Sequence, residues 1–146
     1  MIPNTTQMVL LVEDSTDDQE LAWMAFAESD DHVDLHIVHD GEDAIEFLEY
    51  RGRHAQRRRR TPDLVLLDLH LPRRDGIEVA RHLRATSALA YVPVVMLTTS
   101  NDPDDVRRAY DAGVNSYILK PVDFPGFLDM VRQVQRYWLH LNRVVG

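Results

Sequence analysis

The sequence contains no cysteine, which excludes disulfide bonds, thiolate metal ligands and cysteine nucleophiles and is compatible with a reducing cytoplasm. It also lacks an apolar run long enough to span a bilayer, and the polar stretch 1–7 does not have the apolar centre of a signal peptide. Cations are outnumbered, with 16 Lys and Arg against 24 Asp and Glu and a net charge of −8. Such an acidic chain is a poor general binder of nucleic acid or anionic membrane. We therefore expect a soluble, cytoplasmic protein whose 146 residues form a single domain covering 1–146.

Five short apolar runs alternate with helical patterns along the chain. The runs cover 8–12, 33–38, 64–67, 92–97 and 117–119. The first, third and fourth are nearly continuous, as is typical of parallel strands buried on both faces, whereas the second alternates and suits a strand nearer an edge. The clearest helix start is Asp102-Pro103-Asp104-Asp105, which combines a capping Asp with Pro and acids in the first turn. The order predicts an α/β doubly wound, five-stranded parallel sheet with helices on both faces.

Polar side chains follow the carboxyl ends of four of these runs. They are Glu13-Asp14, Asp68, Thr98-Thr99-Ser100 and Lys120-Pro121. Because ligands bind outside the carboxyl ends of the strands in open α/β sheets, we expect these residues to form one site. Three carboxylates in one place repel each other, and a hard divalent cation such as Mg²⁺, or alternatively Mn²⁺, relieves that repulsion. An aspartate beside a metal, a hydroxyl and a lysine can act as a nucleophile that takes up a phosphoryl group.

The ordered set of motifs resembles that of response regulator receiver domains. The matching pieces are Val12-Glu13-Asp14, Leu66-Leu67-Asp68-Leu69-His70-Leu71-Pro72, Asp75-Gly76, Leu97-Thr98-Thr99 and Tyr117-Ile118-Leu119-Lys120-Pro121, and together they span roughly 7–135. The resemblance implies a flavodoxin-like sheet in the order 2-1-3-4-5 and a stand-alone regulator that is phosphorylated by a sensor histidine kinase. The long segment before the third strand, the sequence 69–76 and the extended tail resemble more narrowly the small regulators paired with phytochrome histidine kinases.

The same resemblance implies a metal-dependent phosphorylation site. Asp68 is the implied phosphoacceptor and one of the metal ligands. Glu13 and Asp14 resemble the acidic pair that holds Mg²⁺, Asp14 directly and Glu13 through water. The backbone carbonyl of His70 is a further implied ligand, whereas its imidazole is not expected to bind the metal.

Resemblance also implies a phosphoryl-binding group and a switch. Thr98 and Lys120 are implied to contact the phosphoryl group, and Pro121 resembles a proline preceded by a cis bond that would aim Lys120 inward. The residues implied to border the site are Thr99, Ser100 and Pro121. Tyr117 stands where the family carries a switch aromatic that turns in when Thr98 moves toward the phosphoryl group, which changes the surface of the fourth helix, fifth strand and last helix. Plain core packing of Tyr117, with its hydroxyl at the surface, is the alternative.

Apolar residues in the last helix, expected from about 123 to 141, are spaced three and four apart. They are Phe124, Phe127, Val131, Val134, Trp138 and Leu141. This heptad seam and the apolar tail, about 136–146, predict homodimerisation, with the tail folding back on its own domain as the alternative. The expected dimer or partner surface comprises Tyr110, Tyr117, Phe127, Val131, Val134, Trp138 and Leu141. Too few residues follow for an output domain, so we expect output through a partner protein, the dimer or onward phosphoryl transfer.

Residues 51–60 form a basic segment of ten residues with six arginines. This composition is typical of a solvated, mobile loop, and a docking patch for an acidic partner is the alternative. Nucleic acid is a less favoured ligand because no helix-turn-helix or aromatic platform accompanies the segment.

Other function classes remain open beside the receiver hypothesis. Haloacid-dehalogenase-type phosphatases also use an Asp nucleophile, Mg²⁺, a hydroxyl and a Lys, but they need a second Asp where this chain has His70. A receiver-like adaptor that needs no phosphorylation is a third class, although every expected site residue is present. A flavin-binding protein is disfavoured because Glu13-Asp14, rather than a phosphate loop, follows the first strand.

Overall fold

The computed structural model describes residues 6–29 and 31–145. The predicted polar stretch 1–7 therefore lies largely outside the described residues, as does Gly146 at the end of the predicted tail. The strands and helices, in chain order, are β1 (Met8–Val12), α1 (Thr16–Glu28), β2 (Asp34–Val38), α2 (Gly41–Glu49), β3 (Leu64–Leu67), α3 (Gly76–Ala85), β4 (Val94–Thr98), α4 (Pro103–Asp111), β5 (Ser116–Leu119) and α5 (Phe124–Val134). Short 3₁₀ turns cover Gly52–His54 and Ser87–Leu89, and a π-helix covers Gln135–Leu141. Of the helices so described, none is both long enough and apolar enough to cross a membrane.

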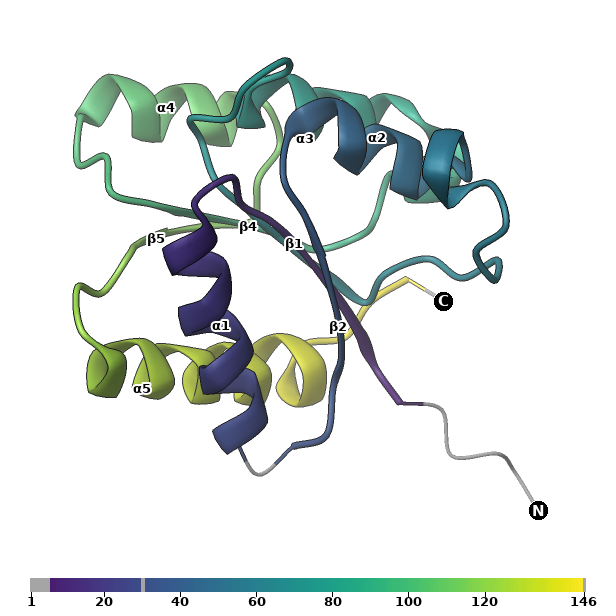
Figure 1. The fold of residues 1–146 in the computed structure, drawn as a ribbon. Helices are drawn as coiled ribbons and strands as arrows, with labels where there is room; N and C mark the ends of the chain where they lie inside the picture. The colour runs from purple at the N-terminus through teal and green to yellow at the C-terminus, as the bar shows by residue number, and fades with distance from the viewer. Residues whose placement is uncertain (1–5, 30, 146) are drawn as a thin grey trace.

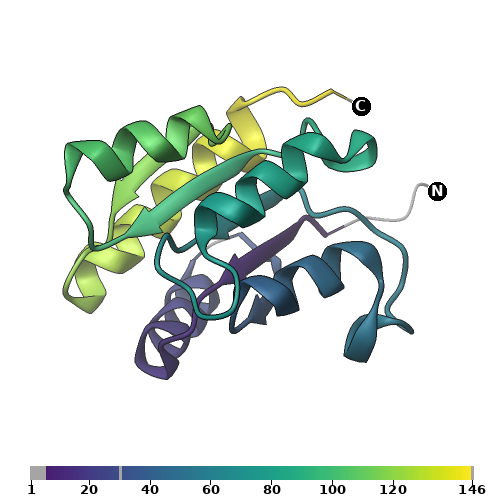
Figure 2. The same cartoon turned by 90° about the horizontal axis from the view of Figure 1, so that it is seen from above.

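Within the described residues, five strands form one parallel sheet in the order β2-β1-β3-β4-β5, which confirms the predicted topology. Helices α1 and α5 cover one face, and α2, α3 and α4 cover the other (Figure 1). Seen from above, α2, α3 and α4 lie side by side across their face (Figure 2). Alternate residues of β1 enter the two cores: Val9 and Leu11 pack under α1 and α5, whereas Leu10 and Val12 pack under α2 and α3. The three central strands β1, β3 and β4 are thus buried on both faces, as the nearly continuous apolar runs predict, whereas the edge strands β2 and β5 are only partly buried.

Each α-helix from α1 to α5 begins at a side chain that accepts a hydrogen bond from a backbone amide in the first turn. These caps are Ser15, Asp40, Asp75, Asp102 and Asp123. Such caps satisfy amides that would otherwise have no partner, each worth about 1 kcal/mol. All five follow the carboxyl end of a strand, so they fix the loops at the edge of the sheet where the predicted site lies.

The last helix departs from the predicted seam after Val134. There the α-helical hydrogen-bond pattern changes to the wider π pattern, which moves the side chains to different positions around the helix axis. Leu139 becomes buried and its carbonyl accepts a hydrogen bond of 2.7 Å from the side chain of Gln7. Leu141, which the seam would place beside Trp138, is 65% exposed.

The prediction that Phe127, Val131 and Val134 belong to a dimer surface is wrong. All three are buried in the core between the sheet, α1 and α5, so their own domain covers them. Trp138 is partly buried against the same cluster. Of the α5 and tail residues in the predicted surface, only Leu141 is largely exposed in the part of the chain that is described.

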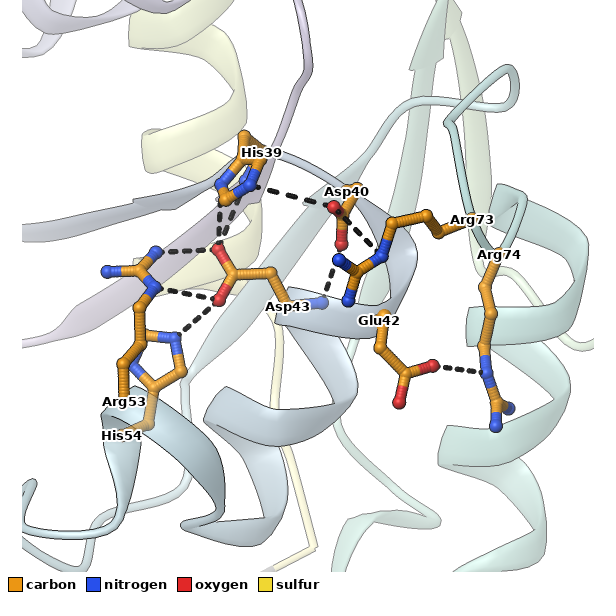
Figure 3. A network of polar contacts seen from close by, with 8 residues as sticks. All are labelled: His39, Asp40, Glu42, Asp43, Arg53, His54, Arg73 and Arg74. Atoms are coloured by element: carbon orange, nitrogen blue, oxygen red, sulfur yellow. Dashed lines mark hydrogen bonds and ion pairs between the residues drawn. The ribbon is translucent and has the colours of Figure 1, made fainter.

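The basic segment 51–60 is held against α2 by specific contacts, where the sequence predicts a solvated loop. Asp43 of α2 is buried, and its carboxylate accepts hydrogen bonds from Nε and Nη2 of Arg53, at 3.0 and 2.6 Å. His54 is buried as well, and its Nε2 lies 2.7 Å from Asp43 Oδ1 (Figure 3). The backbone amide of Asp43 donates a hydrogen bond to the side chain of Asp40, and Asp40 in turn pairs with Arg73 at 3.4 Å. Two buried carboxylates at the start of α2 therefore hold the segments on either side of it: Asp43 binds the basic segment, and Asp40 binds the loop between β3 and α3.

Helix α2 approaches that same loop closely at Gly41. The Gly41 amide donates to the carbonyl of Pro72, and a Cβ at position 41 would lie 1.9 Å from the backbone oxygen of Arg74. Since no real Cβ contact is that short, only glycine fits here.

We predict that Gly41→Ala lowers the free energy of unfolding by about 2 kcal/mol, because the added methyl group forces the two backbones apart. Gly126→Ala is the matched control, since the nearest atom there is the end of the Asp123 side chain, at 2.9 Å. Urea denaturation of the three proteins measures the difference. Equal stability of the two variants would contradict the close packing at Gly41.

A second prediction concerns acid stability. Burial alone would raise the pKa of Asp43, but hydrogen bonds from Arg53 and His54 and the Arg53 charge outweigh burial and lower the pKa to about 2. A carboxylate with a depressed pKa contributes stability above its unfolded pKa and loses that contribution as the pH falls. Between pH 5 and pH 2 the advantage of the wild type over Asp43→Asn should therefore shrink by about 2 kcal/mol. Urea titrations across this range would refute the prediction if the two stability curves ran parallel.

Candidate functional site

Three carboxylates meet at the carboxyl edge of the sheet. Glu13 and Asp14 follow β1, and Asp68 follows its neighbour β3, so parallel pairing brings these distant segments together. One oxygen from each carboxylate lies within 4.8 Å of the others. Glu13 and Asp68 are buried, whereas Asp14 is exposed and opens the cluster to solvent. The structure thus brings together the three acids that the sequence places at the strand ends.

Lys120 lies within this cluster and contacts two of its acids. Its Nζ is 2.5 Å from Glu13 Oε1 and 3.1 Å from Asp68 Oδ2. A third contact, 2.9 Å long, joins Nζ to Asp18 Oδ2. Lys120 is the single lysine of the chain, and its side chain is only 8% exposed. Three acceptors match the three N–H groups of the ammonium, so its charge is fully compensated within the site.

The electrostatics of the cluster follow from burial and from this cation. Burial raises the pKa of Glu13, and hydrogen bonds from Lys120 and from the Ser15 amide offset part of that rise. Burial alone would lower the pKa of Lys120, but hydrogen bonds to Glu13 and Asp18 and the Asp68 charge raise it above its usual value. Lys120 therefore stays protonated near neutral pH and holds a buried positive charge beside Asp68.

Sequence reasoning missed Asp18 as a member of the site. The sequence signal that could have revealed Asp18 is the helix cap at the start of α1. There Ser15 accepts a hydrogen bond from the Asp18 amide at 3.2 Å. That cap puts Asp18 in the first turn, immediately beyond the carboxyl end of β1. Its side chain is free to reach Lys120, which lies 102 positions further along the chain.

The expected cis bond before Pro121 is wrong, since none of the peptide bonds in the described ranges is cis. Lys120 enters the site without it. Its backbone amide donates to the carbonyl of Thr98 at 2.8 Å, which continues the pairing of β5 with β4 by one more residue. Strand register and three carboxylate partners are sufficient to direct the side chain inward.

Thr98, Ser100 and Tyr117 form a separate group beside the cluster. Thr98 is buried as the last residue of β4, and within the described residues no hydrogen bond joins it to Asp68. The Tyr117 ring packs against the core under α2–α4, and its hydroxyl donates to the carbonyl of Ser100 at 2.9 Å. Burial, together with nearby carboxylates such as Asp105, raises the pKa of the Tyr117 hydroxyl. The hydroxyl of this partly buried side chain is therefore bound to the loop after β4.

The remaining predicted residues lie in the loops that follow β3 and β4. Thr99 is exposed, and the Ser100 hydroxyl donates to Asp105 at 2.5 Å. The His70 side chain is 68% exposed, and its Nε2 lies 3.8 Å from the same Asp105 carboxylate. A Cβ at Gly76 would lie 2.3 Å from the Asp68 carbonyl, so glycine allows α3 to start directly against the Asp68 backbone.

The arrangement combines an oxygen-only donor set with a nucleophile and a fixed cation. Carboxylate oxygens without His or Cys favour hard divalent cations. Asp68 can attack an electrophilic phosphorus, and the Lys120 ammonium can stabilise the oxygens of the group that is transferred.

Comparisons with known proteins agree with this geometry. The family model for the response regulator receiver domain matches residues 9–132. The response regulator Rcp1 of a Synechocystis species is 38% identical over 136 residues, which cover 93% of this chain and 91% of Rcp1. A probable methanogenesis regulatory protein of Methanothrix harundinacea, FilR2, is 39% identical over 139 residues, 95% of this chain and 88% of that protein.

Solved structures of similar proteins have the same fold. The phosphorylated cyanobacterial phytochrome response regulator RcpA superposes with a TM-score of 0.89 at 34% identity, covering 97% of this chain and all of that one. The Mn²⁺-bound form of Rcp1 has a TM-score of 0.85 at 35% identity and covers 96% and 99% of the two chains. With the family model spanning most of its length, this chain belongs to the response regulator receiver domain family, a family of two-component signalling proteins.

Proposed function

We propose that this protein is a stand-alone response regulator that accepts a phosphoryl group on Asp68 from a sensor histidine kinase, in the presence of Mg²⁺. The observation that carries the proposal is the contact of the chain's single lysine with Asp68 inside a cluster of three carboxylates. Nucleophile, cation and metal-binding oxygens are the three parts that phosphoryl transfer to an aspartate needs.

Asp14, Asp68 and the backbone carbonyl of His70 are the proposed direct metal ligands, and Glu13 is proposed to hold the metal through water. Oxygen donors alone suit Mg²⁺, and the Mn²⁺-bound structure of Rcp1 supports Mn²⁺ as a substitute. When bound, the metal neutralises negative charge on the carboxylates and on the incoming phosphoryl group. Exposed Asp14 leaves one side of this ligand set accessible from solvent.

In the proposed reaction an Asp68 oxygen attacks the phosphorus of a phosphohistidine on the kinase. The phosphorus–nitrogen bond breaks, its electron pair stays on the imidazole, and that nitrogen takes up a proton from solvent. Lys120 then exchanges its contact with Asp68 for one with a phosphoryl oxygen, while Glu13 and Asp18 continue to hold the ammonium. The Thr98 hydroxyl donates a second hydrogen bond to the phosphoryl group.

The proposed output is a change in the surface formed by α4, β5 and α5. Movement of Thr98 toward the phosphoryl group alters the loop after β4, and the hydroxyl of Tyr117 is bonded to that loop through Ser100. Tyr110, 48% exposed on α4, and Leu119, 46% exposed on β5, lie on this surface. Tyr117 therefore connects the loop after β4 to the surface formed by α4, β5 and α5, because its hydrogen bond depends on the position of that loop.

Similarity to Rcp1 and RcpA supports a phytochrome-type kinase as the partner. We further propose that residues 1–146 act as one receiver domain with a C-terminal tail, that the protein works in the cytoplasm, and that it forms a homodimer. The exposed apolar side chains of Leu141, Val144 and Val145 support a dimer contact in the tail.

The first prediction of this proposal is a phosphoryl adduct. Incubation with acetyl phosphate and Mg²⁺ should add one phosphoryl mass to the intact wild type, and Asp68→Asn or a chelator should abolish it. Asp75→Asn, which changes a helix cap near the site, is the matched control and should retain the adduct. An adduct of equal yield in Asp68→Asn would refute Asp68 as the acceptor.

The second prediction concerns charge compensation. Lys120→Met leaves buried Glu13 and Asp68 without their cation and should cost about 3 kcal/mol of unfolding free energy at pH 7 in a chelator. Millimolar Mg²⁺ should restore part of that loss because a bound metal replaces the missing positive charge. Arg136→Met, which removes an exposed cation from the C-terminal helix, is the control and should change stability little. Equal stability of the two variants in the chelator would contradict the proposed role of Lys120.

A further inference from the structure

The basic segment 51–60 stands apart from the rest of the chain in its charge. It carries six of the 16 Lys and Arg residues, and no acid occurs from Tyr50 to Pro62. The other 136 residues hold ten cations against 24 acids. The segment precedes β3, at the amino end of the sheet, whereas Asp68 follows the carboxyl end of the same strand. A ligand on this segment would therefore leave the phosphorylation site open.

Arg57 builds the inner part of this segment. Its guanidinium stacks on the rings of Phe47 and Tyr50, with its central carbon 3.8 and 4.3 Å from the two centroids. Its Nε donates to the Phe47 carbonyl at 2.8 Å, and one terminal nitrogen donates to the carbonyls of Arg58 and Arg60 at 3.2 and 3.0 Å. This one side chain therefore fixes the backbone on which its basic neighbours are mounted.

Two further anchors hold the ends of the segment. Arg53 and His54 pair with buried Asp43 (Figure 3). At the other end, Arg60 pairs with Asp63 and donates to the carbonyl of Thr6. Held at both ends and in the middle, the segment presents a preorganised surface, which lowers the entropy cost of binding a ligand.

Arg58 and Arg59 are the outward side chains of this surface. Both are exposed, and over residues 6–29 and 31–145 neither has a carboxylate within ion-pair distance. Arg59 stacks on the ring of Tyr50, with its guanidinium carbon 4.5 Å from the ring centroid. Stacking on an aromatic ring orients a guanidinium and leaves its N–H groups available. Two of these parallel N–H groups can then donate hydrogen bonds to the two oxygens of one carboxylate.

We propose that Arg58 and Arg59 bind a short acidic segment of a partner protein. Acids border the surface, since Glu49 pairs with Arg51 and Asp63 pairs with Arg60. A duplex nucleic acid or an anionic membrane would bring many phosphates against these carboxylates, whereas a short acidic peptide needs to meet only the guanidinium groups of Arg58 and Arg59. The overall negative charge of the chain repels every anionic ligand and opposes a long polyanion more strongly than a short peptide. This interaction goes beyond phosphoryl transfer and does not rest on it.

A fluorescein-labelled peptide of alternating Glu and Asp serves as the probe, and fluorescence anisotropy measures its binding. The wild type should bind it with an affinity that falls as salt rises, and Arg58→Glu combined with Arg59→Glu should weaken binding about tenfold or more. Arg132→Glu combined with Arg136→Glu, on exposed positions of the C-terminal helix, makes the same change in net charge and should leave binding within about twofold. Asp68→Asn should bind like the wild type.

Two results would overturn the proposal. Equal weakening in the two double variants would show that only net charge matters, and tighter binding of duplex DNA or phosphatidylserine vesicles than of the peptide would assign the surface to another ligand. Circular dichroism melts of both variants exclude unfolding as the cause of any loss. Because the peptide assay needs no phosphorylation, its failure leaves the proposed role of Asp68 untouched.

Discussion

The ammonium of Lys120, held by Glu13, Asp18 and Asp68, is the interaction on which the site depends. Carboxylates brought this close repel each other, and burial of Glu13 adds a desolvation cost that one buried cation offsets. The same cation stands beside the proposed phosphoacceptor, so the group that stabilises the resting cluster is also in place for an incoming phosphoryl group. Structure and proposed chemistry therefore rely on one side chain.

The order of the parallel strands brings the residues of this cluster together from distant segments of the chain. Glu13 and Asp68 come from neighbouring strands β1 and β3, while Lys120 extends the β4–β5 pairing by one residue. Capped helix starts then fix the loops on which the acids stand, and the absence of a Cβ at Gly76 lets α3 approach the Asp68 backbone. A site at the carboxyl edge is the natural outcome of such a sheet, since every strand ends there.

Much of this could be predicted from the sequence because buried parallel strands are nearly continuous apolar runs, and polar residues directly after them must share one edge. The part that could not be predicted depends on side-chain reach and on local geometry. Asp18 reads as an ordinary first-turn acid until the fold brings Lys120 to it. A prediction from heptad spacing assumes a regular α-helix, so it cannot reveal the π-helix in which Leu139 is buried. An arginine run looks solvated because composition does not show that Arg57 stacks on two rings of the preceding helix.

The most direct test follows the side-chain nitrogen of the only lysine by NMR in protein labelled with ¹⁵N-lysine, since a single ammonium signal is expected. We expect that signal to be visible in the free protein, because an ammonium with three carboxylate partners exchanges its protons slowly with water. With Mg²⁺ already present, addition of beryllium fluoride, a phosphoryl mimic, should shift the signal in the wild type and leave it unchanged in Asp68→Asn. A signal already lost to rapid exchange in the free protein, or an equal shift in both proteins, would contradict the account.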